Sequence, residues 1–149
     1  MKRILSVLAL VLGILLLISC ASKKPITTQE EADTAFQKVY QKFKGDIILE
    51  GEEQYTVKSG DTLTKIAHEK YKNGYYFPLI MLASSDVVLD PDKINVGDKL
   101  TIPVLQSNLD DAKAKGKIKN FLGEIASVYD RREGRAPDAQ HLRDLAATL

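Results

Sequence analysis

The side chains best suited to nucleophilic or metal chemistry are few in this sequence. The only cysteine is Cys20, and the two histidines are His68 and His141. A cysteine nucleophile needs a histidine base, and a zinc site needs several Cys or His ligands at short spacings. Neither pattern is present, although paired carboxylates are not recognisable in a chain with 20 Asp and Glu. We therefore expect no catalytic residue, no metal site and no dissociable cofactor, with both histidines on the surface.

Composition narrows the class of protein further. A chain of 149 residues that is 44% apolar fits one domain, or one small domain with added helices, and is neither disordered nor collagen-like. The formal net charge is +1, and it becomes about −1 without residues 1–19, which contain Lys2 and Arg3. Such a balance gives no electrostatic reason to expect a nucleic-acid partner. A single cysteine excludes an intrachain disulfide.

The start of the chain reads as a targeting signal. Residues 4–18 carry no charge and follow two basic residues, and this run is short for a membrane-spanning helix. It ends at Leu17-Ile18-Ser19-Cys20, which resembles the lipobox of bacterial lipoproteins. The resemblance implies removal of residues 1–19, diacylglycerol on the Cys20 thiol and, in many bacteria, a further acyl chain such as palmitate. An uncleaved anchor and an ordinary secreted protein are the alternatives.

The segment after Cys20 is expected to tether a first helix. Residues 20–28 are small, basic and contain a proline, which suits a tether. Thr28 and Glu31 have the spacing of a capping box. Apolar residues then recur at helical spacing until Gly45, so we predict an amphipathic helix over 29–44 within the segment 29–45. Residues 46–54 form a connector that contains an ambiguous short strand or turn.

Residues 55–103 have the order strand, helix, helix, strand. Tyr55-Thr56-Val57 and Leu100-Thr101-Ile102 alternate as strands do. Either Asp61 or Thr62 caps the first helix. We expect seven apolar residues to form a small core: Val57, Leu63, Ile66, Ile80, Leu82, Leu100 and Ile102.

The remaining residues, 107–149, predict a C-terminal helical hairpin. Ser107 opens the first helix, whose apolar stripe runs from Ile118 to Tyr129, and Pro137 begins the second. The apolar stripes of this first helix and of helix 29–44 must be buried against another surface. That surface is a helical bundle, the 55–103 segment, or a second copy in a dimer. Three arginines fall in the turn between the two C-terminal helices and are interpreted as solvated charges, with anion binding as the alternative: Arg131, Arg132 and Arg135.

Residues 55–103 resemble a LysM domain. The resemblance rests on an opening Tyr-Thr-Val-Lys-Ser-Gly-Asp-Thr-Leu at 55–63 and a closing Val-Gly-Asp-Lys-Leu-Thr-Ile-Pro at 96–103. The family fold is α+β, with a two-stranded antiparallel sheet and two helices on one face. LysM domains bind N-acetylglucosamine-containing glycans such as peptidoglycan in a groove between two loops. The resemblance therefore implies glycan contacts at Gly60, Asp61, Thr62, Leu63, Pro91, Asp92 and Ile94.

Each of these seven residues also has a structural interpretation, such as backbone conformation, capping, core packing or a turn. The chain departs from many LysM domains at Ser84 and Val96, and the long loop over 84–94 resembles a subgroup that includes a bacterial potassium-binding protein with a BON domain. No BON-like segment is evident. The aromatic residues at 75–77 could stack on sugars, but packing is the more common role of such residues.

These patterns predict a non-catalytic, lipid-anchored protein of the bacterial cell envelope, facing the periplasm or the exterior. Its LysM domain would bind peptidoglycan and tether the membrane to the wall or assist envelope assembly. One alternative is a protein-interaction scaffold with a degenerate LysM domain, which would bind a partner or a second copy through helices 29–44 and 118–129. Another is potassium sensing.

Overall fold

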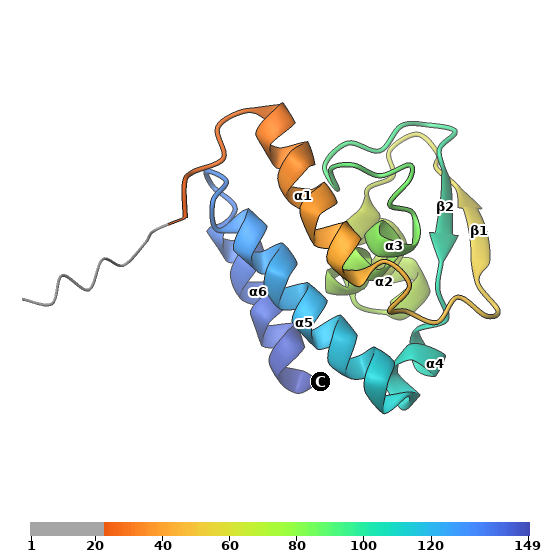
Figure 1. The fold of residues 1–149 in the computed structure, drawn as a ribbon. Coiled ribbons are helices and arrows are strands. Elements are labelled where there is room, and N and C mark those ends of the chain that lie inside the picture. The colour runs from red at the N-terminus through yellow and green to blue at the C-terminus, as the bar shows by residue number, and fades with distance from the viewer. Residues whose placement is uncertain (1–22) are drawn as a thin grey trace, which may run out of the picture.

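The computed structural model describes residues 23–149, so the expected signal segment and Cys20 lie outside the described residues. The described chain contains one two-stranded antiparallel sheet at one side of the molecule, and helices that make up the rest (Figure 1). The predicted α+β class is confirmed. The helix α3 (Phe77–Ala83) contacts both the sheet and the C-terminal helix α5 (Ala112–Tyr129), and thus joins the two halves of the molecule.

The expected strand, helix, helix, strand unit is present. Strand β1 (Glu53–Thr56) pairs with β2 (Lys99–Ile102), with Glu53 opposite Ile102 and Thr56 opposite Lys99. Between them lie α2 (Leu63–Tyr71), a 3₁₀ turn η1 (Gly74–Tyr76) and α3. β1 begins two residues before the predicted strand. All seven predicted core residues are buried: Val57, Leu63, Ile66, Ile80, Leu82, Leu100 and Ile102.

The turn after α2 depends on a close approach between two segments. Lys72 ends the helix in the left-handed conformation, with φ of 61°. A Cβ placed on Gly74 would lie 2.7 Å from Cγ2 and 3.0 Å from the carbonyl oxygen of Thr64. A side chain at 74 would therefore push η1 away from α2, which explains the glycine at this position.

Helix α1 (Gln29–Phe43) forms as predicted, with a complete capping box. The Thr28 hydroxyl accepts a hydrogen bond from the Glu31 N–H, while the Glu31 carboxylate accepts one from the Thr28 N–H. Gly45 follows the helix with φ of +86°. Residues 46–52 of the connector contain turns and no strand, while residues 53 and 54 belong to β1. The Ile48 N–H and carbonyl both bond to the side chain of the buried Asn108, at 2.8 Å each.

The C-terminal part differs from the prediction at its start. We expected one helix from Ser107, but α4 (Leu105–Asp110) and α5 (Ala112–Tyr129) are separate. Asp111 lies between them in an extended conformation, and its carboxylate accepts a hydrogen bond from the Ala114 N–H at 2.7 Å. Capping of α5 by this side chain therefore interrupts the helix. Helix α6 (Ala136–Thr148) then packs alongside α5, with Pro137 in its first turn.

The apolar stripes of α1 and α5 face each other inside the chain. Phe43 meets Phe121 edge to face at a centroid distance of 5.3 Å, and Phe36 meets Tyr129 at 5.7 Å. Phe77 of α3 joins the same cluster, 6.3 Å from Tyr129. Helices and sheet therefore share one core. Each stripe is covered by the other within the same chain. Exposure of these stripes was the reason for expecting a protein partner or a second copy on them, and the structure removes that reason.

The segment before α1 is docked rather than free. Ile26 pairs with Arg132 in a parallel bridge, and the Ile26 N–H donates to the Arg131 carbonyl at 2.8 Å. Lys24 forms a 2.8 Å ion pair with Glu31. Residues 24–28 of the expected tether are therefore docked on the folded part of the chain. Within the described residues, no helix is both long and apolar enough to cross a membrane.

Candidate functional site

Two loops meet at one end of the two-stranded sheet. The first, residues 57–62, leaves β1, and the second, residues 84–98, leads into β2 (Figure 1). The Val57 N–H donates to the Asp98 carbonyl at 2.9 Å, and the Gly97 N–H donates to the Val57 carbonyl at 2.9 Å. The antiparallel register thus joins the start of the first loop to the end of the second. The two loops carry six of the seven predicted glycan-contact residues, and the seventh, Leu63, is the first residue of α2.

The first loop is held by its own side chains. Asp61 accepts hydrogen bonds from the Lys58 N–H and from the Tyr55 hydroxyl, both at 2.8 Å. The Lys58 N–H and then the Tyr55 hydroxyl lower the pKa of Asp61, while the same hydroxyl contact raises the pKa of Tyr55 to about 12. Asp61 therefore remains a charged acceptor that closes the turn.

The other residues of this loop divide into structural and exposed groups. Thr62, not Asp61, is the N-cap of α2, because its hydroxyl accepts from the Lys65 N–H at 3.2 Å. Leu63 is buried in the core. Gly60 is exposed with φ of +84°, which favours glycine. Of the four predicted contact residues, Gly60 and Thr62 are the exposed ones.

The second loop is centred on a buried carboxylate. Asp90 is 1% exposed and accepts from the Gln29 amide at 2.8 Å, from the Asp92 N–H at 2.9 Å and from an Arg132 Nη at 3.2 Å. Burial of a charged group is tolerated when it is paired and hydrogen-bonded in this way. Pro91 is also buried, whereas Ile94 is half-buried and packs on the edge of the core.

The arginines of the α5–α6 turn, residues 130–135, hold this loop. Asp92 forms an ion pair with Arg132 at 3.2 Å and accepts a hydrogen bond from Arg135 at 3.0 Å. The Arg135 guanidinium also lies over the Tyr129 ring at 4.7 Å. The interpretation of these arginines as solvated charges is therefore wrong for Arg132, which is only 17% exposed, and for Arg135. We call residues 130–135 the arginine turn.

Sequence reasoning missed an apolar feature of the second loop. The structure exposes Val87 (45%), Leu89 (46%) and Val96 (71%), and these are three of the four large hydrophobic side chains exposed among the described residues. The Val-Val-Leu run at 87–89 within a turn-rich segment was the available signal. Exposed apolar groups beside backbone polar groups suit the acetamide methyl and ring faces of a sugar.

The aromatic residues at 75–77 are used mainly in packing. Tyr76 and Phe77 are buried. Tyr75 stacks on His141 of α6, with ring centroids 4.5 Å apart. His68 lines a shallow hollow with Thr64 and Tyr75, on the face of α2. Among the described residues, no three His, Cys, Asp or Glu side chains are grouped as metal ligands.

Comparison with known proteins identifies the segment that contains both loops. Residues 55–103 match the family described as LysM domain. A stretch of 49 residues is 45% identical to the Potassium binding protein Kbp of Escherichia coli O6:H1 and covers 33% of each chain, so the match spans about a third of that relative's length. No solved structure matches the chain. The chain therefore contains a LysM domain at residues 55–103, a member of a family that binds N-acetylglucosamine-containing glycans such as peptidoglycan.

Proposed function

We propose that this protein is a non-catalytic cell-envelope lipoprotein that binds peptidoglycan through the two loops of its LysM domain and is anchored to a bacterial membrane by lipid on Cys20. The observation that carries the proposal is the meeting of the two loops at one end of the sheet, fixed by the bonds between Val57 and residues 97 and 98. Bound to lipid at one end and glycan at the other, the protein tethers the membrane to the wall or assists envelope assembly.

The chemistry of the loops suits a neutral sugar polymer. The carboxylates of Asp61, Asp90 and Asp92 are all engaged within the protein, which leaves exposed backbone around Gly60 and the apolar side chains of the second loop for a ligand. A shallow site with few anchoring groups gains little per sugar. Long glycans should therefore bind better than short oligomers, since they offer many overlapping sites.

Retention on purified, insoluble peptidoglycan tests the proposal. Leu89→Ser removes an exposed apolar side chain from the second loop, whereas Leu49→Ser removes one of similar exposure (40%) outside the LysM domain. We expect Leu89→Ser to weaken retention several-fold and Leu49→Ser to leave it unchanged. Ile94→Arg is a less clean variant, because Ile94 packs against the core. Absence of retention by the unmodified protein would contradict the proposal.

Potassium binding is a second candidate function, supported by the 45% identity to a protein named for potassium binding. Carbonyl cages for potassium leave no side-chain signature, so sequence gives no further support. A potassium titration followed by NMR, with sodium as the control, separates this candidate from glycan binding. Amide shifts in potassium alone, without peptidoglycan retention, would favour it.

A further inference from the structure

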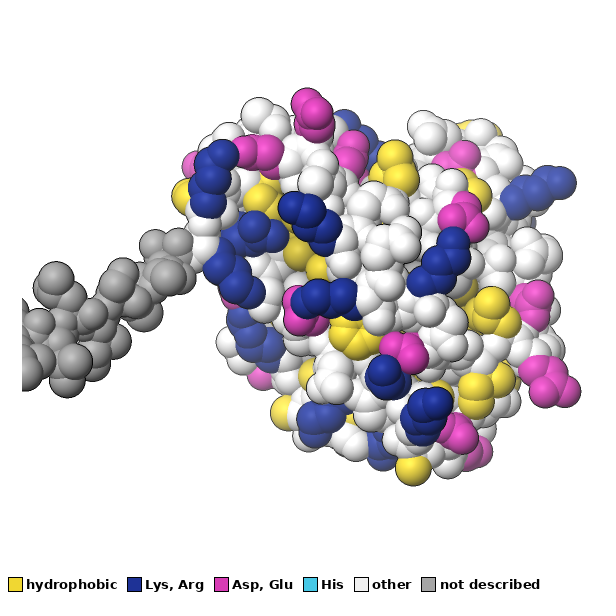
Figure 2. Space-filling model, in the orientation of Figure 1, with side chains coloured by type: hydrophobic (Ala, Val, Ile, Leu, Met, Phe, Trp, Pro, Cys, Tyr) yellow, Lys and Arg dark blue, Asp and Glu magenta, His cyan; other side chains and the backbone are white. Residues whose placement is uncertain are grey.

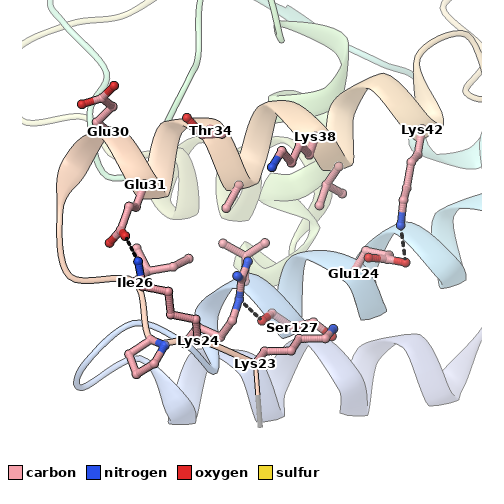
Figure 3. Close-up of a pocket in the computed structure, with 15 residues that line it drawn as sticks. Lys23, Lys24, Ile26, Glu30, Glu31, Thr34, Lys38, Lys42, Glu124 and Ser127 are labelled. Carbon is pink, nitrogen blue, oxygen red and sulfur yellow. Dashed lines mark hydrogen bonds and ion pairs between the residues drawn. The ribbon is translucent and has the colours of Figure 1, made fainter. Parts of the chain in front are cut away.

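The surface around the docked N-terminal segment differs in charge from the rest of the chain. Two hollows that share Lys23, Glu124 and Ser127 lie along α1, α5 and α6. Figure 3 shows the first of them, between the N-terminal segment, α1 and α5. Eight Lys or Arg and three Glu line them, although the chain after residue 19 has 19 Lys and Arg against 20 Asp and Glu. Figure 2 shows basic side chains gathered on this side of the molecule, where the N-terminal segment joins it. We call this surface the basic face.

Some of the basic side chains on this face are already neutralised, and others are not. Four of the eight form ion pairs: Lys24 with Glu31 at 2.8 Å, Lys42 with Glu124 at 2.9 Å, Lys117 with Asp46 at 3.0 Å, and Arg143 with Asp130. Lys23, Lys38 and Lys119 have no ion-pair partner among the described residues, and all three are exposed. The basic face therefore keeps a local positive charge available to an external anion.

The position of the basic face follows from the docking of the N-terminal segment. Residues 24–28 are fixed to α1 and to the arginine turn, so Lys23 lies at the edge of the docked segment and three positions from Cys20 in the sequence. Three residues span at most about 11 Å. A lipid on Cys20 would therefore hold Lys23, and the hollows that it lines, next to the bilayer surface. Electrostatic attraction acts over about 8 Å at physiological salt, which is a similar distance.

We propose that the basic face lies against the membrane and binds the phosphate groups of anionic phospholipids, which orients the LysM domain away from the bilayer. The proposal rests on acylation of Cys20 but not on glycan binding. A Lys or Arg near an anionic surface strengthens binding about fivefold. Since the acyl chains already hold the protein at the bilayer, a few such contacts suffice to fix its orientation.

Fluorescence quenching in vesicles tests this orientation with the full lipidated protein. Cys20 is the only cysteine, so an introduced cysteine is the only free thiol once Cys20 is acylated. A fluorophore is attached at Thr34→Cys on the basic face or at Val96→Cys, an exposed position beside β2. Quenching by a lipid with a nitroxide headgroup is compared in phosphatidylcholine vesicles and in phosphatidylcholine–phosphatidylglycerol vesicles.

We expect strong quenching at position 34 in the phosphatidylglycerol vesicles, its loss in high salt, and little quenching at position 96. Lys38→Glu with Lys119→Glu should reduce headgroup contact at position 34 at least about fivefold. Lys93→Glu with Lys99→Glu is the matched control, with the same change of net charge on exposed residues of the LysM domain, and should have no effect. Equal quenching at both positions, or an equal effect of the two double variants, would overturn the proposal. Labelling at two thiols, seen by mass spectrometry, would instead show that Cys20 is not acylated and remove its basis.

Discussion

The two loops of the candidate glycan site are held in place in different ways. The first loop is fixed by residues within a few positions of each other, such as Asp61 with Lys58. The second is fixed by residues outside the LysM domain, namely Gln29 of α1 and the arginine turn. One half of the site thus belongs to the domain alone, while the other depends on the flanking helices. In this chain the LysM domain and its flanks are one structural unit.

The largest expected effect tests whether the two regions share a core. Phe121 of α5 is buried against Phe43 of α1. Phe121→Ala should lower the free energy of unfolding by about 3–5 kcal/mol. Urea unfolding measures the loss. Because the core is continuous, amide exchange in β1 and β2 should accelerate as well, although neither strand contains the substitution. Unchanged exchange in the sheet would show that the LysM domain is independently stable.

The next effect concerns the second loop. Arg132→Ala leaves Asp90 buried without its cationic partner, and should lower the free energy of unfolding by about 3 kcal/mol. NMR should show shifted amide signals over residues 87–94. Retention on insoluble peptidoglycan should be weaker than that of the unmodified protein. Arg131→Ala is the control, because the Arg131 guanidinium donates only to the Ser127 carbonyl among the described residues. Equal effects of the two variants would argue against a specific role for the Arg132–Asp90 pair.

The first loop should respond more weakly and more locally. Thr62→Ala removes the N-cap of α2 and should cost about 1 kcal/mol of stability. Thermal unfolding measures this loss, and Thr62→Ser should restore most of it. Amide shifts should stay within residues 58–66. Shifts that extend into residues 87–94 would mean that the two loops are coupled. They would contradict the conclusion that the first loop is held by its own residues.

The smallest effect concerns the docked N-terminal segment and its dependence on pH. Hydrogen bonds from Lys24 and from Thr27 lower the pKa of Glu31 from 4.5 to about 2. A lowered pKa means that the stabilising contribution is complete above pH 4.5 and is lost as the pH falls through about 2. The protection of the Thr27 and Thr28 amides, measured as the intrinsic exchange rate divided by the observed rate, should therefore persist at pH 4 and fall near pH 2. Loss of protection centred near pH 4.5 would contradict the lowered pKa.

Local patterns predicted the fold well, because local chemistry determines those elements. The Thr28–Glu31 capping box and the alternation of Leu100 and Ile102 are visible in the sequence and are present in the structure. The break at Asp111 was missed, since an aspartate inside an apolar periodicity can either face solvent or cap a helix. The pairing of Arg132 with Asp90 joins residues 42 positions apart. Such contacts depend on how helices dock, which periodicity does not reveal.

The candidate site was predictable only in outline, because the exposure of its residues also depends on how distant segments dock. The LysM motif located both loops, but it did not distinguish exposed Gly60 from buried Leu63, which lies three residues later. Exposure of Val87 and Leu89 depends on the course of a long loop with no helix or strand. Their roles as glycan contacts remain predictions of the proposed function.

The docking of Ile26 on the arginine turn has a mechanical consequence. If the protein is held by lipid at one end and by glycan at the other, tension enters through residue 26 and passes through the arginine turn to Asp90 and Asp92. The first non-covalent contacts on this path are the Lys24–Glu31 ion pair and the Ile26 bridge. Their release would lengthen the link between membrane and wall by several residues while the glycan-binding loops stay folded.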